Sequence, residues 1–383
     1  MKVALVLTND WELFGDGSGD YYDIQHNPSL DLLNVLSEFD AKMTLFAEVG
    51  QQWGYKSIID KNKYASKIVT DWEDLIRKYY KAGHDIQLHI HPQWLDGKYQ
   101  NNQWTLDDTK WSIGKLPKDK KFDYLNRGKQ YLEYTIRKID DNYQCNSFRA
   151  GAYYIEPSSQ VIELLEKLGF TADSSVTKGR IVSSYYDYTN APDNLIPWRI
   201  KESVAINNPN GKIIEYPIYS HFTLDSEVLR KFLPSLYFKW KFGKSPTSQE
   251  THWAIERDRI KEARYPRDRR AYKKNEVRHF WWYVSKFISK NPIQLDYDYL
   301  PATAFVEIIK KIINNKKYYK YYDAGITLPI IATGHIKDAH TNDNLKWILE
   351  KLKNELVEDV EFWTMKDAIK QFTNIETINF HQK

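Results

Sequence analysis

The chain has 383 residues, of which 42% are hydrophobic and 28% charged, a composition that is typical of globular proteins and excludes a disordered chain. A net charge of +4 is too small to indicate nucleic-acid binding, and a single cysteine, Cys145, excludes an intrachain disulfide and a zinc–thiolate cluster. The apolar run at the N-terminus is too short for a signal peptide, and no window has the apolar length of a membrane span. We therefore expect a cytoplasmic protein.

The first 50 residues alternate apolar strands with an amphipathic helix. Val3 to Leu7 is a continuous apolar run, which is typical of a strand buried on both faces. A helix with leucines at helical spacing runs from Pro28 to Phe39, and Lys42 to Val49 supplies the next strand. Asp10 and Glu12 follow the first strand, where α/β folds place their chemistry. A solvated turn before a helix cap is the alternative interpretation of these two acids.

The same alternation continues through most of the chain. Helices are predicted at 71–82, 123–139, 157–168, 302–313, 342–352 and 365–371. Strands are predicted at 85–91, 170–176, 213–218, 327–332 and 360–363, and 147–154 is the end of another strand. Strands that alternate with helices favour a mainly parallel sheet with the helices outside, so we expect an α/β fold.

One segment interrupts this rhythm. Residues 225–291 are crowded with lysine, arginine and aromatic residues, and they predict a basic, aromatic, helical insertion. The rest of the chain has no internal repeat, low-complexity tract or linker. We therefore expect one domain over 1–383 that carries this insertion.

The segment from Gly83 to Trp94 contains two histidines in a strand pattern. His89 and His91 are two residues apart, so their side chains leave the same face of the strand, and Pro92 ends it. Two imidazoles side by side at the carboxyl end of a strand form half of a metal site. A pair of hydrogen-bonded polar histidines is the alternative interpretation.

Further polar residues stand at the ends of later strands. Arg149, Asp173 and His335 each follow or end a predicted strand. In a parallel barrel the carboxyl ends of the strands converge on one mouth, where these side chains would meet the two acids and the two histidines. The sequence thus predicts one polar site at that mouth.

Five motifs of this chain resemble those of the NodB-like polysaccharide deacetylases, carbohydrate esterase family 4. The stretches that carry the resemblance are Thr8-Asn9-Asp10-Trp11-Glu12, His89-Ile90-His91-Pro92-Gln93-Trp94, Arg149-Ala150-Gly151-Ala152-Tyr153, Asp173-Ser174-Ser175-Val176 and Gly334-His335. The subgroup found in bacterial surface-polysaccharide loci is the most similar. The resemblance implies a distorted (β/α)7 barrel and a hydrolase that removes an N-acetyl or O-acetyl group from a sugar of a surface polysaccharide or its precursor.

The resemblance also implies a divalent metal ion and its ligands. Zinc is the expected metal, with cobalt, nickel or manganese as alternatives. Glu12, His89 and His91 would hold the metal, and Asp10 would act as the general base. The two carboxylates could exchange roles, because their spacing does not separate the two tasks.

The remaining site residues take supporting roles in this scheme. His335 would protonate the departing amine, Arg149 would orient the general base, and Asp173 would hold His335 in the correct tautomer. Tyr153 and Trp94 would line the substrate site. The substrate would be a carbohydrate, either free or linked to a nucleotide or a lipid.

The motifs depart from the family in two places. The family's histidines are four residues apart, which would pair His89 with Gln93, so the sequence leaves open whether His91 or Gln93 completes the metal site. The arginine motif lacks its usual proline.

A glycoside hydrolase with two carboxylates and no metal, and a sugar-binding relative without catalysis, are the alternative functions. The insertion at 225–291 also mixes aromatics with cations, which allows a peripheral contact with the inner face of a membrane.

Overall fold

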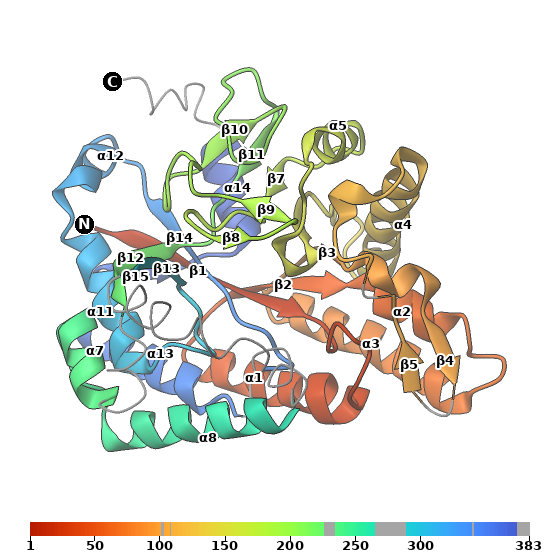
Figure 1. The fold of residues 1–383 in the computed structure, drawn as a ribbon, viewed down its shortest axis with the longest axis horizontal. Helices are drawn as coiled ribbons and strands as arrows, with labels where there is room; N and C mark the ends of the chain where they lie inside the picture. The colour runs from red at the N-terminus through yellow and green to blue at the C-terminus, as the bar shows by residue number, and fades with distance from the viewer. Residues whose placement is uncertain (101–102, 108, 226–233, 265–288, 339–340, 374–383) are drawn as a thin grey trace, which may run out of the picture.

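The computed structural model describes residues 1–100, 103–107, 109–225, 234–264, 289–338 and 341–373. One curled sheet runs through the middle of the molecule (Figure 1). Eight of its described strands are parallel, and seven of these stand in the order β11-β7-β6-β3-β2-β1-β14. In chain order they are β1 Val3–Trp11, β2 Met43–Glu48, β3 Asp85–Ile90, β6 Ser147–Ala150, β7 Ala172–Asp173, β11 Ile213–Glu215 and β14 Leu328–Ala332.

Two more strands extend this sheet. β10, Trp198–Ile200, pairs antiparallel with β11 at one edge, and β15, Val360–Phe362, pairs with the first residues of β1. The sheet curls until the chain that follows β11 meets β14, where Ile218 and Ile331 form a parallel bridge. The Tyr219 backbone N–H donates to the Ile331 carbonyl at 2.9 Å. The predicted fold class, an α/β protein whose mainly parallel sheet forms a distorted barrel, is confirmed, and the sheet is a curled half-barrel.

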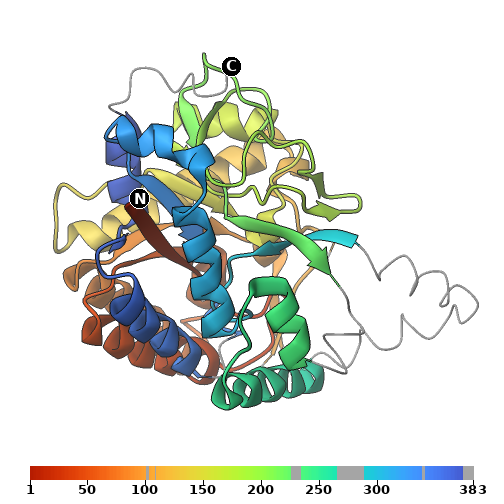
Figure 2. The ribbon, with the colours of Figure 1, turned by 90° about the vertical axis from the view of Figure 1, so that its left-hand side faces the viewer.

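The main helices lie outside the sheet (Figures 1 and 2). They are α1 Asn27–Glu38, α2 Val49–Lys56, α3 Lys63–Lys81, α4 Lys118–Arg137, α5 Ser159–Lys167, α11 Ala302–Ile313, α12 Tyr319–Asp323, α13 Asp343–Glu355 and α14 Met365–Thr373. α3 shows why these sequences are helical. Its apolar residues recur at helical spacing and are buried, and the Asn62 side chain accepts the backbone N–H groups of Tyr64 and Ala65 at its start.

Short elements fill the connections. The helical ones are η1 Tyr22–His26, η2 Pro92–Asp96, η3 Ile113–Lys115, η4 Gly151–Tyr153 and η6 Lys316–Tyr318. Two small hairpins pair β4 Lys98–Gln100 with β5 Gln103–Thr105 and β8 Ile181–Val182 with β9 Tyr186–Asp187. The strand β1 continues to Trp11, so Asp10 lies inside the strand and not in a turn after it.

The described part of the insertion consists of two strands and two helices. β12, Ser220–Asp225, pairs antiparallel with β13, Ser289–Gln294, and α7, Pro234–Phe242, and α8, Ser248–Arg264, lie between them in the chain. The two helices lie next to each other on one flank (Figure 2). The basic and aromatic runs within 267–283 lie outside the described residues. Within the described part of the chain, none of the helices is both long and apolar enough to cross a bilayer.

Candidate metal and active site

Four buried side chains meet at the carboxyl ends of three neighbouring strands. Glu12 follows β1, Glu48 ends β2, and His89 and His91 stand at the end of β3. One ligand atom from each lies within 4.8 Å of the others. Glu12 Oε2 is 2.6 Å from His91 Nε2 and 3.6 Å from His89 Nε2. Two carboxylates and two imidazoles at this spacing can hold a metal ion.

The orientation of His89 supports a metal at this position. Its Nδ1 lies 2.9 Å from the Arg149 carbonyl oxygen, an acceptor, so Nδ1 carries the proton and Nε2 presents a lone pair to the cluster. The Nε2 atoms of His89 and His91 are both buried without a partner in hydrogen-bond geometry. Buried polar nitrogens are normally satisfied, so these two fit the requirements of a metal ion.

Gln93 contacts the opposite side of the His91 ring. Its Nε2 lies 2.9 Å from His91 Nδ1 and 3.2 Å from the Gly15 carbonyl oxygen. His91 therefore presents Nε2 to Glu12, and Gln93 lies behind it as a partner of the other ring nitrogen. This is the position of a residue that orients a ligand.

Glu48 was not predicted as a site residue. Its Oε1 accepts the Gly50 backbone N–H at 2.5 Å, and its Oε2 accepts the His91 backbone N–H at 2.5 Å. Burial raises the pKa of Glu48 to about 8. A Cβ at Gly50 would lie 2.6 Å from Glu48 Oε1, so only glycine allows this approach. The available signal was an acid at the end of a buried strand, the pattern that singled out Asp10 and Glu12.

A buried ion pair stands beside the cluster. Arg149 Nη1 donates to Asp10 Oδ1 at 2.7 Å, and the guanidinium also donates to the Ser174 carbonyl and to two hydroxyl groups. Burial would raise the pKa of Asp10, but the charge of Arg149, with His89 and His335, outweighs it and the pKa is lowered. Asp10 is therefore ionised at neutral pH.

His335 faces Asp10 from the last part of the chain. Its Nε2 lies 3.5 Å from Asp10 Oδ2, and the Asp10 backbone N–H donates to the Gly334 carbonyl at 2.9 Å. On the other side of the ring, His335 Nδ1 is 4.0 Å from Asp338, and the backbone N–H of His335 donates to Asp298 Oδ2 at 2.6 Å. A Cβ at Gly334 would lie 2.2 Å from the Tyr297 ring, so a glycine is required before His335.

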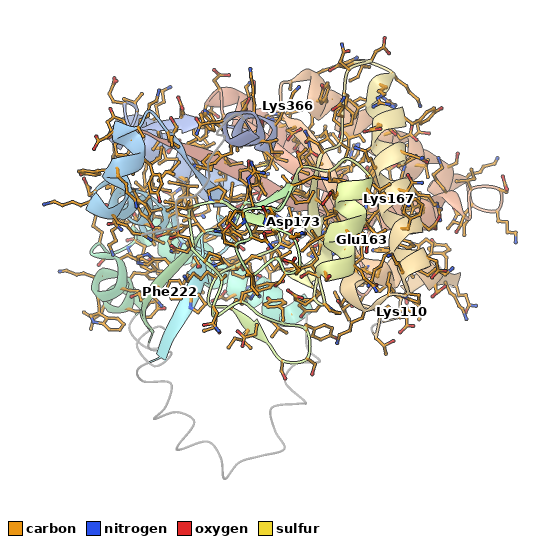
Figure 3. All side chains as sticks on the ribbon, turned by 90° about the horizontal axis from the view of Figure 1, so that it is seen from above. Lys110, Glu163, Lys167, Asp173, Phe222 and Lys366 are labelled. Atoms are coloured by element: carbon orange, nitrogen blue, oxygen red, sulfur yellow. The ribbon has the colours of Figure 1, made fainter. Side chains whose placement is uncertain are left out.

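The predicted contact between Asp173 and His335 is absent from the described contacts. Asp173 lies in the interior (Figure 3) and accepts the backbone N–H and the hydroxyl of Ser175. Its other neighbour is the buried carboxyl of Glu215, and burial raises the pKa of both acids. The described carboxylates near His335 are those of Asp10 and Asp338, beside the ring, and of Asp298, which accepts the backbone N–H.

A cavity of about 570 Å³ opens onto the cluster. Its wall includes Glu12 and His91, and also His335 and Tyr153. Its volume is within the range of small-molecule sites, roughly 300–1,000 Å³. Trp94 is not in this wall, because it is buried with its ring 5.4 Å from that of Trp104. The tryptophan that lines the cavity is Trp111.

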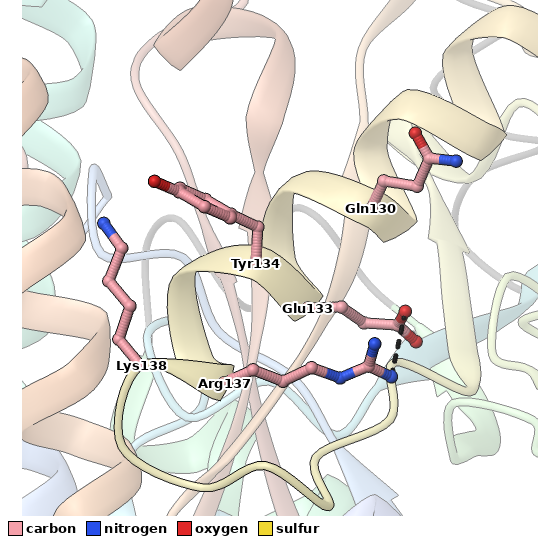
Figure 4. A pocket seen from close by; sticks show the side chains of 5 residues that line it. All are labelled: Gln130, Glu133, Tyr134, Arg137 and Lys138. Carbon is pink, nitrogen blue, oxygen red and sulfur yellow. Dashed lines mark ion pairs between the residues drawn. The ribbon is translucent and has the colours of Figure 1, made fainter.

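A second depression lies on the outer surface of α4 and shares no lining residue with this cavity (Figure 4). It is lined by Gln130, Glu133, Tyr134, Arg137 and Lys138. Its charged groups already have partners, since Arg137 pairs with Glu133 at 3.2 Å and Lys138 lies over the Tyr134 ring. It therefore has no part in the site at the strand ends.

No protein-family model and no curated protein matches the sequence. Solved structures do match. A protein from Mycobacterium smegmatis that is named a polysaccharide deacetylase is 15% identical, with 96% of this chain and 90% of that one covered and a TM-score of 0.43. An allantoinase is 14% identical, with 98% and 91% covered and a TM-score of 0.45. A protein from Pseudomonas aeruginosa PAO1, also named a polysaccharide deacetylase, is 12% identical, with 98% and 92% covered and a TM-score of 0.45. Over nearly its full length, and at low sequence identity, the chain is similar in fold to polysaccharide deacetylases and to an allantoinase.

Proposed function

We propose that this protein is a metal-dependent hydrolase that removes an acetyl group from a sugar of a surface polysaccharide or its precursor. The observation that carries the proposal is the buried cluster of two carboxylates and two imidazoles beside a cavity, with an ionised Asp10 and His335 facing each other next to it. A metal site next to an acid–base pair is one arrangement that catalyses the hydrolysis of an amide or ester.

Glu12, His89 and His91 would hold the metal, with Glu48 as a fourth donor or as the support of His91. Nitrogen and carboxylate ligands suit zinc, and they also accept cobalt, nickel or manganese. When bound, such a cation lowers the pKa of a water molecule and polarises a carbonyl group. Glu12 suits the ligand role because the charges of His91 and Lys337 outweigh burial and hold its pKa well below the usual value.

Asp10, buried beside the cluster, and His335, in the cavity wall, would supply the proton transfers. Asp10 Oδ2 accepts the proton of the attacking water, because its other oxygen is held by Arg149. Its lowered pKa keeps it ready to act as a base at neutral pH. His335 Nε2 donates its proton to the departing amine nitrogen, and Asp298 holds the residue in place by accepting its backbone N–H.

Acetate release tests this proposal. Protein that has been stripped with a chelator and reloaded with zinc, cobalt, nickel or manganese is incubated with N-acetylated and O-acetylated sugars. We expect acetate only after reloading, and its loss in Asp10→Asn, which keeps the metal ligands. Cleavage of glycosidic bonds without metal would establish the glycoside hydrolase instead. Sugar binding without acetate release under any of the four metals would establish a non-catalytic protein.

A contact with the inner face of a membrane would bring a lipid-linked sugar to this cavity. In the described part of the insertion, Leu236 and Trp240 stand one turn apart on α7 and are 52% and 47% exposed, next to the exposed Lys239. Apolar and cationic side chains on one helix face suit the surface of an anionic bilayer. Flotation with anionic liposomes at low and moderate salt tests this contact. Protein that stays in the soluble fraction at both salt concentrations would exclude it.

A further inference from the structure

Arg180 lines the same cavity but has no role in the chemistry described above. It lies between β7 and β8, and its Nη1 donates to Gln294 Oε1 at 2.6 Å. Gln294 is itself fixed, because its Nε2 donates to Thr177 Oγ1 at 2.8 Å. The Arg180 guanidinium carbon lies 5.6 Å from the centre of the Tyr153 ring. A neutral amide and an aromatic face therefore hold this half-buried cation in place.

The charge of Arg180 is not balanced by an acid. No carboxylate of the described residues lies within 4.0 Å of its guanidinium, whereas the other cations at this site are paired. Arg149 pairs with Asp10, and Lys337 lies 2.5 Å from Glu12. The remaining acids of the cavity wall, Asp296 and Asp338, are the neighbours of His335. A partly buried arginine normally has an anionic partner, because taking its charge out of water is costly.

We propose that Arg180 binds an anionic group, a phosphate or a carboxylate, that the acetylated sugar carries. This inference rests on the proposed function and specifies its substrate class. The guanidinium offers several N–H donors in one plane, which matches the oxygens of either group. Nη1 donates to Gln294, and no described residue accepts a hydrogen bond from Nη2 or Nε of this cavity-lining side chain. The metal cluster would then select the acetyl group, and Arg180 would select the charge elsewhere on the same molecule.

The test compares three acetamido sugars that differ in charge: the methyl glycoside of N-acetylglucosamine, N-acetylglucosamine 1-phosphate and N-acetylmuramic acid. The protein is the metal-loaded full chain, as wild type and as Arg180→Gln. Arg199→Gln is the matched control, since the Arg199 side chain donates to the Gly211 carbonyl, at 3.2 Å, with no other side-chain hydrogen bond to a described residue, and does not line the cavity. Acetate release gives kcat/KM, and calorimetry gives the affinity for each sugar and for inorganic phosphate.

We expect wild type to prefer at least one charged sugar to the neutral glycoside. Arg180→Gln should lower kcat/KM and affinity for that sugar by about 10- to 100-fold, the usual effect of losing charge-assisted hydrogen bonds, and leave the neutral glycoside within twofold. The charged sugar whose kcat/KM falls in Arg180→Gln shows whether Arg180 binds a phosphate or a carboxylate. Equal losses of kcat/KM and affinity on all three sugars would show that Arg180 has a structural role. Unchanged values on all three would show that Arg180 binds none of them. Either result overturns the inference but leaves the proposed acetate release intact. Charged-sugar binding that depends on Arg180 without any acetate release would instead refute the hydrolase and keep the anion site.

Discussion

Replacing Arg149 with methionine is the most direct test of the buried ion pair at the centre of the site. Methionine keeps much of the apolar volume of the arginine chain, but it removes the guanidinium, whose carbon lies 4.1 Å from the centre of the Phe46 ring. Asp10 then stays buried with its main positive neighbour gone. The pKa of Asp10 should rise, and the folded state should lose stability at neutral pH.

The magnitude follows from what each variant leaves unpaired. Arg149→Met removes the ion pair and three further hydrogen bonds, and breaking a buried pair from one side costs roughly 3–5 kcal/mol. Asp10→Asn leaves the guanidinium with the Ser174 carbonyl and the hydroxyls of Thr8 and Ser174, so we expect a smaller loss of roughly 1–3 kcal/mol. The double variant should lose about 1–3 kcal/mol less than the sum of the single variants.

Urea unfolding of the four proteins, all treated with a chelator so that metal loss has no effect, measures the double-mutant cycle. A loss below about 1 kcal/mol in Arg149→Met would contradict the reasoning, because it would mean that water reaches Asp10 in the folded state. Additive losses would contradict it as well, since they would show that the two charges do not interact.

Three other predictions test single features. Gly151→Ala should weaken metal affinity about 10- to 100-fold in a competition with a chromogenic chelator, because the new Cβ would lie 2.6 Å from His91 Cγ and 2.7 Å from the Ile90 carbonyl; unchanged affinity would contradict this packing. Burial lowers the pKa of His84 from 6.5 to about 4, so the unfolded chain takes up the proton first and stability falls as the pH drops from 6.5 towards 4. Wild type should lose about 2 kcal/mol more than His84→Asn between pH 7.5 and pH 5 in urea unfolding, and equal losses would refute the shift. Burial raises the pKa of the Cys145 thiol to about 12, so a thiol reagent should label it only in urea; rapid labelling of the folded protein would refute its burial.

The periodic elements could be predicted from the sequence. The helix predicted at 302–313 is α11 to the residue, and the strand predicted at 327–332 is β14 with one residue fewer. Both have a strong apolar pattern bounded by clear start or stop signals. Weakly periodic segments were harder. α2 was missed because it has few apolar residues and two glycines, and it forms where Glu48 accepts the Gly50 N–H.

The site residues that stand at strand ends could be predicted from the sequence. Their hydrogen-bond partners from distant segments could not, because only the folded chain brings those segments together. Asp10, Glu12, His89, His91, Arg149 and His335 are all at strand ends in the sequence, and the structure brings them together at one end of the sheet. The partners of His335 could not be found in this way. Asp298 belongs to an irregular segment after the insertion, and only the three-dimensional structure brings its carboxylate to the His335 backbone.

The order of these residues along the chain has a consequence for biosynthesis. Glu12, Glu48, His89 and His91 all belong to the first quarter of the sequence, whereas His335 and Lys337 belong to the last part, and Lys337 pairs with Glu12 across 325 residues. A ribosome therefore releases every proposed metal ligand long before it releases His335, the residue proposed to protonate the leaving group. On this proposal a nascent chain binds a cation early, yet it stays inert until β14, which precedes His335, joins β1.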